Sequence, residues 1–324
     1  MAKFLIVAIA LLFVQCRSAG AANQDCMADY YRTKAPGCVD SVLSQFRQAA
    51  AGSKADPSTI IGFLAQLFVV SPEDKQRILN DESSDHVRSV HLVALYRAGL
   101  LDDARRFAEK HQLAALLQKL ETTRPASLAV VRPSSTPADN DLLIGAYMAS
   151  GDTAFIQRIL ENFSGADDGM ASDAMRMGYM NSKFGPNLTP KGREENVMAR
   201  AGCAKYQCKT DPAKFLRVLT LSSAFWALQS LAQGDDGIKK TFAGFFARDT
   251  RLKNLLAAEQ ATFENYLTAL AVAAAFKPDH ASPTEVDPTY TSMSKAAAAY
   301  ENLEPASNVF APIEAFTKSG KPPK

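Results

Sequence analysis

The 324-residue sequence lacks the residue patterns by which common enzyme classes are identified. It contains no G-x-S-x-G hydrolase elbow, no H-E-x-x-H zinc helix, no phosphate-binding loop and no G-x-G-x-x-G dinucleotide turn. The haem attachment pattern C-x-x-C-H is also missing. We therefore predict no catalytic residue, no cofactor and no metal site, and we favour a protein that is not an enzyme.

The sequence also has no excess of one charge and no long hydrophobic run. Lys and Arg number 36 and Asp and Glu number 34, without a basic block, so we expect no nucleic-acid partner. The longest apolar run, Phe4–Val14, has 11 residues. This is about half of the ~20 residues that a membrane-spanning helix requires, so we expect no integral membrane span.

The order of residues at the N-terminus predicts a secretory signal peptide. Lys3 supplies a basic start, Phe4–Val14 the apolar centre, and Ser18–Ala22 the small residues that precede cleavage. Cleavage after Ala21 fits best, with Ala22 as the alternative, and a retained anchor is less favoured. We expect the mature protein to be periplasmic or secreted, and the alanine-rich composition favours a bacterial cell envelope.

The cysteines fit an exported protein. Cys16 lies in the predicted signal peptide, where Gln15 occupies the position at which a lipid-attachment site has a small residue. The mature chain keeps four cysteines, an even number that predicts disulfides in an oxidising compartment. Proximity favours the pairs Cys26–Cys38 and Cys203–Cys208, although four cysteines allow three pairings. Metal binding is less favoured, because no histidine lies near a cysteine in sequence.

Hydrophobic periodicity predicts an all-α fold. Pairs such as Asp56-Pro57, Ser71-Pro72 and Asp211-Pro212 join an N-cap residue to a first-turn proline and predict helix starts. Phe215–Ala232 is apolar on nearly every face, which is typical of a buried central helix. Strand signals are nearly absent, and the best candidate is Ser127–Val131.

One proline-rich segment suggests a division of the chain into two helical units. Arg124–Pro137 holds three prolines and no helical pattern. We predict it to be a linker between an N-terminal helical unit, residues 22–123, and a C-terminal helical unit, residues 138–318. Residues 319–324 are predicted to be a disordered tail, and residues 1–21 the signal peptide.

The segment Leu92–Glu109 resembles the middle of a tetratricopeptide repeat. In that family an aromatic residue on the first helix precedes a small residue at the turn, and an alanine follows on the second helix. The matching residues here are Tyr96, Gly99, Ala104 and Phe107. Glycine permits a tight turn, and alanine lets the two helices approach closely.

A second, weaker copy is Leu143–Leu160, which turns at Gly151. The two glycines are 52 residues apart, whereas the family repeats every 34 residues. The resemblance implies stacked antiparallel helical hairpins, repeat-like but irregular. Ordinary antiparallel helices joined at a glycine remain an alternative interpretation.

Two classes of function remain from the sequence. The first is an exported binding or scaffold protein of the bacterial envelope, holding a protein or peptide partner in a groove between helical hairpins. The alternative is an envelope hydrolase or lyase that acts on peptidoglycan. Its candidate groups are weak: Ser292–Lys295 is an isolated S-x-x-K, Glu82-Ser83 lies in a polar segment, and His91 shares a helix face with apolar residues.

Overall fold

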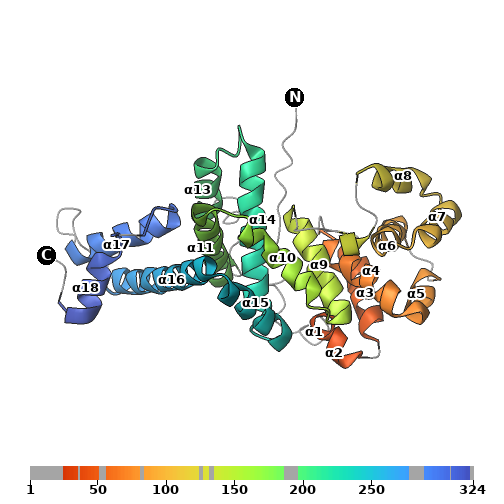
Figure 1. Ribbon diagram of the computed structural model, residues 1–324, viewed down its shortest axis with the longest axis horizontal. Helices are drawn as coiled ribbons and strands as arrows, with labels where there is room; N and C mark the ends of the chain where they lie inside the picture. Colours follow the sequence, from red (N-terminus) through yellow and green to blue (C-terminus); the bar gives the residue numbers. More distant parts are fainter. Residues whose placement is uncertain are drawn as a thin grey trace. The chain divides into compact units, whose positions relative to one another are not determined.

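The computed structural model describes residues 25–35, 37–50, 56–80, 84–123, 127–130, 135–185, 196–276, 288–306 and 308–321. Within these ranges the protein contains seventeen α-helices, one 3-10 turn and no strand, which confirms the all-α prediction. The helices of the first half of the chain are α1 (Asp25–Ala28), α2 (Tyr30–Thr33), α3 (Cys38–Ala50), α4 (Ser58–Val70), α5 (Pro72–Leu79), α6 (Asp85–Arg97), α7 (Leu101–Lys110), α8 (Ala114–Thr123), η1 (Leu128–Val130), α9 (Pro137–Ser150) and α10 (Ala154–Ser164) (Figure 1). Those of the second half are α11 (Asp168–Phe184), α13 (Val197–Lys205), α14 (Pro212–Leu231), α15 (Asp236–Arg248), α16 (Thr250–Phe276), α17 (Pro288–Glu301) and α18 (Ala311–Ser319).

The helices pack into two compact units. Unit 1 comprises Met1–Asn162 and Leu228–Ala243, and unit 2 comprises Phe163–Ala227 and Gly244–Lys324. The boundaries therefore fall inside α10, α14 and α15.

Helix α4 forms the centre of unit 1 and packs against both α6 and α9. The contact with α9 is the closest, because a glycine lies on each helix at the crossing. A Cβ atom at Gly62 of α4 would come within 2.6 Å of the carbonyl carbon of Leu142, and one at Gly145 of α9 within 2.7 Å of the nitrogen of Phe63. The missing side chains thus let the two backbones touch.

Both glycine turns expected from the sequence are present, and α6 packs against α7. Gly99 lies between α6 and α7 with φ 76°, and Gly151 lies between α9 and α10 with φ 75°, the left-handed region that favours glycine. Ala104 is fully buried, as a close approach of α7 to α6 requires. The local resemblance to tetratricopeptide repeats stays a prediction. Helix α9 packs chiefly on α4.

The N-terminal helices of unit 1 are held by a disulfide and by a buried carboxylate. Cys26 is bonded to Cys38 with 5.8 Å between the Cα atoms, which fastens α1 to the start of α3. Asp235, at the start of α15, accepts hydrogen bonds from the hydroxyls of Tyr147 at 2.8 Å and Tyr31 at 3.1 Å. Because Tyr31 belongs to α2 and Tyr147 to α9, this carboxylate joins three helices.

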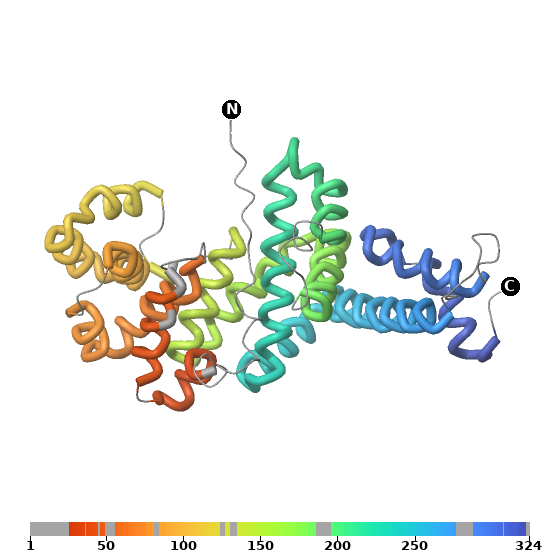
Figure 2. Tube along the Cα trace, turned by 180° about the vertical axis from the view of Figure 1, so that it is seen from behind, coloured from red at the N-terminus to blue at the C-terminus, as the bar shows by residue number. Residues whose placement is uncertain are grey.

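Unit 2 has an aromatic core around α16. Figure 2 shows α17 running alongside α16, the longest helix of the described chain. Tyr266 stacks on Tyr300 at 4.8 Å between ring centroids, and Tyr179 stacks on Phe263 at 4.9 Å. The apolar segment predicted to be central is α14, in which Val218, Phe225 and Leu228 are fully buried.

Some predictions are corrected or fall on undescribed residues. The strand candidate Ser127–Val131 was wrong: Leu128–Val130 forms a 3-10 turn, and Ser127 makes only an isolated bridge with Ala98, so no partner strand stabilises an extended segment. Val131 lies outside the described residues, as do the signal peptide 1–21 and residues 322–324 of the predicted tail.

The predicted linker Arg124–Pro137 is described only in part. Its last residue, Pro137, starts α9, where the hydroxyl of Thr136 accepts from the backbone N–H of Asp139 in a capping box. Helices α8 and α9, which flank the segment, belong to the same compact unit. The division into separate N- and C-terminal helical domains at this segment stays a prediction.

Candidate functional site

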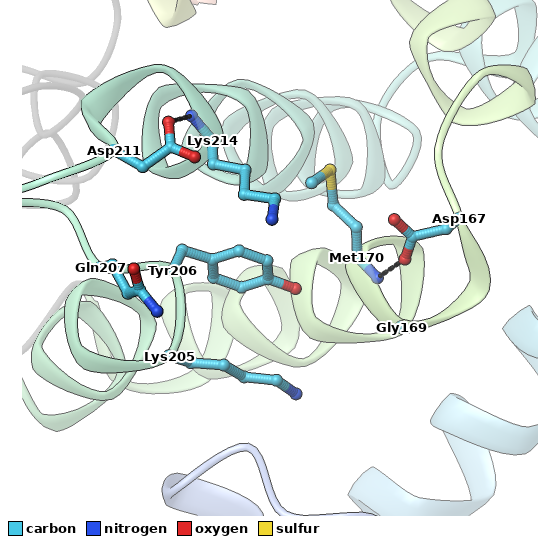
Figure 3. A pocket seen from close by; sticks show the side chains of 8 residues that line it. All are labelled: Asp167, Gly169, Met170, Lys205, Tyr206, Gln207, Asp211 and Lys214. Atoms are coloured by element: carbon cyan, nitrogen blue, oxygen red, sulfur yellow. Dashed lines mark hydrogen bonds between the residues drawn. The ribbon is translucent and has the colours of Figure 1, made fainter.

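The candidate site is a hollow of about 310 Å³ in unit 2, formed where the starts of α11 and α14 face the turn that follows α13. Six of its eight lining residues have polar or charged side chains (Figure 3). The lining residues are Asp167, Gly169, Met170, Lys205, Tyr206, Gln207, Asp211 and Lys214. We call it the Lys205–Lys214 pocket.

A disulfide encloses the turn that supplies three of these residues. Cys203 is bonded to Cys208 with 4.7 Å between the Cα atoms, so Lys205, Tyr206 and Gln207 lie inside a closed loop. The N–H of Cys208 also donates to the carbonyl of Cys203 at 2.9 Å, and Gln207 takes a left-handed φ of 50°. This short covalent loop limits the conformations open to the turn that carries the three lining residues.

A buried acid beneath the turn fixes two of the side chains. Asp173 on α11 is 1% exposed and accepts a hydrogen bond from the hydroxyl of Tyr206 at 2.5 Å. The ammonium of Lys205 lies 2.8 Å from the same carboxylate and 3.3 Å from the carbonyl of Leu303. Burial, followed by the hydrogen bond to Asp173, raises the pKa of Tyr206 above its ordinary value, so this hydroxyl stays a proton donor.

Two further carboxylates at the rim cap helices. The Asp167 Oδ1 atom accepts from the N–H of Met170 at 2.8 Å at the start of α11, and the Asp211 Oδ1 atom accepts from the N–H of Lys214 at 3.3 Å at the start of α14. Both aspartates therefore have a structural role as helix caps. The side chain of Lys214 extends toward the ring of Tyr206, and its ammonium has no acceptor among the described residues (Figure 3).

The groups that line the pocket can form hydrogen bonds and ion pairs with a ligand. The pocket presents amines, carboxylates, a tyrosine and an amide on a fixed frame, with no cysteine thiol and no histidine in its lining. Over the described part of the chain, no group of three or more His, Cys, Asp or Glu side chains is placed to hold a metal ion. None of the helices built from described residues is long and apolar enough to cross a membrane.

The residues singled out in the sequence are distributed over both units. The proximal pairing of the four cysteines is confirmed, and only Cys203–Cys208 borders the pocket. His91 is 1% exposed and lies 6.2 Å from the ring of Phe107, as expected for a core histidine. Lys295 is exposed on α17, and Glu82-Ser83 lies outside the described residues.

The pocket residues other than the disulfide frame were missed by sequence reasoning. The available signal was local: the four residues between Cys203 and Cys208, followed at once by the Asp211-Pro212 helix start. Nothing in the spacing connects them to Asp167 and Asp173, which lie more than thirty residues earlier. Only the packing of α13 on α11 brings these groups together.

One carboxyl group outside the pocket is strongly perturbed. Burial, and secondly the negative charge of Asp56, raises the pKa of Asp141 on α9 to about 7. Asp56 itself accepts hydrogen bonds from the N–H and hydroxyl of Ser58 at the start of α4. Asp141 lines neither the Lys205–Lys214 pocket nor the hollow between α16 and α17.

Comparisons with known proteins return no match to a family model, to a curated protein or to a solved structure.

Proposed function

We propose that the protein is an exported, non-enzymatic binding protein of the cell envelope, which holds a peptide or protein partner through the Lys205–Lys214 pocket. The observation that carries the proposal is the fixed turn. Lys205 and Tyr206 are anchored on the buried Asp173 and enclosed by the Cys203–Cys208 bond. A site whose side chains are already ordered loses less conformational entropy when a ligand binds.

The proposed location rests on three features. The N-terminal residues have the order of a signal peptide cleaved after Ala21 or Ala22. The two disulfides are of the kind that persists in an oxidising compartment such as the periplasm or the cell exterior. The alanine-rich composition favours a bacterial source.

The test uses a photo-crosslinking residue in the pocket. In the mature protein, residues 22–324, Gln207 is replaced by benzoylphenylalanine and the protein is irradiated in envelope extract. We expect one crosslinked species, which disappears when Lys214→Glu is added. The same photoreactive residue at Lys240, exposed on α15, is the control and should not give that species. Equal crosslinking from both positions, or no effect of Lys214→Glu, would contradict the proposal.

One observation favours the alternative of an envelope hydrolase or lyase. Cleavage of glycan needs a carboxylic acid that stays protonated near neutral pH, and Asp141, with a pKa of about 7, meets this electrostatic requirement. The experiment is release of muropeptides from purified peptidoglycan by the mature protein. Release that is lost in Asp141→Asn, while the variant keeps its helical circular dichroism spectrum, would establish the enzyme and overturn the binding proposal.

A further inference from the structure

The charges of the Lys205–Lys214 pocket are not equivalent, because one cation is already neutralised. Lys205 lies 2.8 Å from the buried carboxylate of Asp173 and adds little net charge. The ammonium of Lys214 has no acceptor among the described residues, so it is the cation available to a ligand. A ligand carboxylate placed beside it would form a charge-assisted hydrogen bond.

An available anion lies on the opposite side of the hollow. Asp167 belongs to the α11 side, across from Lys214 of α14 (Figure 3). Its Oδ1 atom caps α11 by accepting from Met170, and its Oδ2 atom has no donor among the described residues. A ligand ammonium group could therefore be bound there without disturbing the helix cap.

This separation of charge selects among ligand classes. A simple anion would be attracted by Lys214 but repelled by Asp167 and Asp211. A simple cation would be attracted by these two aspartates but repelled by Lys214. A ligand that carries both charges gains both contacts. The hollow, about 310 Å³, is at the lower end of the ~300–1,000 Å³ range for small-molecule pockets, which suits a ligand of one or two amino acids.

From these contacts we infer that the Lys205–Lys214 pocket binds a small zwitterion, namely a free amino acid or a dipeptide. Its carboxylate pairs with Lys214 and its ammonium with Asp167. The ring of Tyr206, which lies between the two lysine side chains in Figure 3, supplies the apolar surface for the ligand's side chain. This inference rests on the proposed function and specifies the ligand of the same site.

The test is titration calorimetry of the mature protein with L-alanyl-L-alanine and two blocked forms. The amide form lacks the carboxylate, and the N-acetyl form lacks the ammonium. We expect dialanine to bind about five- to tenfold more tightly than either blocked form, as the loss of one charge-assisted contact implies. Equal affinities for all three, or no heat of binding at about 10 mM dialanine, would overturn the inference.

Two conservative variants assign each contact to its residue. Lys214→Gln should remove the preference for dialanine over its amide while keeping the preference over N-acetyl-dialanine. Asp167→Asn should remove the preference for dialanine over N-acetyl-dialanine while keeping the preference over the amide. Asparagine still caps the helix, so the fold is preserved. Lys253→Gln, on an exposed position of α16, is the matched control and should leave all three affinities unchanged. Loss of both preferences in either variant, or their persistence in both, would contradict the assignment.

The outcome also separates this inference from the proposed function. Suppose that the protein does not bind dialanine more tightly than its blocked forms, but the Gln207 crosslink still depends on Lys214. The zwitterion assignment is then wrong and the binding proposal stands. If the crosslink also fails, both are wrong. Displacement of dialanine by inorganic phosphate at equal concentration would show a general anion site and would overturn the zwitterion assignment.

Discussion

The two units of the protein bury a carboxylate in different ways. In unit 1, Asp235 is 6% exposed and receives hydrogen bonds from neutral donors: the Tyr31 and Tyr147 hydroxyls and the backbone N–H groups of Gly237 and Ile238. In unit 2, Glu259 is 4% exposed and faces the guanidinium of Arg176 in a two-pronged ion pair, with distances of 2.7 and 3.0 Å. The first charge is stabilised by dipoles and a helix terminus, the second by an opposite charge.

This difference predicts how each unit responds to loss of a partner. Removing one neutral donor from Asp235 leaves three others, so the remaining carboxylate keeps most of its stabilisation. Removing Arg176 leaves Glu259 with a buried, uncompensated charge, which is far more costly. The same contrast extends to packing, because unit 1 depends on a close backbone crossing and unit 2 on stacked aromatic rings.

The largest effect is expected for Arg176→Met. It leaves Glu259 unpaired and should lower the free energy of unfolding by about 3–5 kcal/mol. Urea denaturation followed by the fluorescence of Trp226, the only tryptophan and a residue of unit 2, measures this effect. Adding Glu259→Leu should restore most of the loss, because both charges are then absent. If the single variant lowers the free energy of unfolding by less than about 1 kcal/mol, the ion pair does not contribute substantially to stability.

The next effect tests the close crossing in unit 1. Gly145→Ala places a Cβ atom against the backbone of α4 and should cost about 2–3 kcal/mol, because the helices must move apart. The measurement is urea denaturation followed by circular dichroism. Gly244→Ala is the control, since a Cβ there meets nothing within 4 Å, and it should be neutral or stabilise by up to ~1 kcal/mol. Equal effects of the two substitutions would mean that α4 and α9 do not touch.

A smaller loss is expected at the other buried carboxylate. Tyr147→Phe removes one of four donors to Asp235 and should cost about 1 kcal/mol. Asp235→Asn should cost about 1–2 kcal/mol, because asparagine still caps α15 but loses the charge. Circular dichroism with urea measures both variants. If either costs as much as Arg176→Met, the contrast between the two buried carboxylates is wrong.

The last effect has the opposite sign and depends on pH. The pKa of Asp141 is raised to about 7 in the folded chain from about 3.9 when unfolded, so the folded state binds more protons between these values. Its contribution to stability is therefore present at low pH and is lost as pH rises from about 4 to 7. Asp141→Asn should remove this dependence and stabilise unit 1 by about 1–2 kcal/mol at pH 7.5. Thermal unfolding midpoints at pH 5 and 7.5 measure it, and a larger gain at pH 5 would contradict the assignment.

The local features of the fold could be predicted from the sequence because short stretches determine them. Ser71-Pro72 was expected to start a helix, and Ser71 does cap α5 by accepting from the N–H of Asp74. Gly99 and Gly151 were expected to be turns, and both take the left-handed conformation that other residues adopt at a cost. The disulfides were predictable for the same reason, since each joins cysteines at most 12 residues apart.

The features that decide the packing and the candidate site join residues far apart in the chain. The glycines at the α4–α9 crossing are 83 residues apart, and Tyr31 is 204 residues from Asp235. From the sequence alone, each glycine is only a residue of low helix propensity, and its role becomes visible once the partner backbone is known. In the same way, nothing in the sequence distinguishes Asp173 from the other acidic residues. Its role follows from the contacts with Lys205 and Tyr206.

The sequence by itself therefore determined the helical fold class, the positions of several helix ends and the two disulfides, because backbone propensity, capping and short-range covalent bonds act over a few residues. Only the tertiary structure decided which helices cross, which carboxylates are buried and where a pocket forms. Those outcomes depend on burial and on charges brought together from distant segments, and a linear spacing does not encode them.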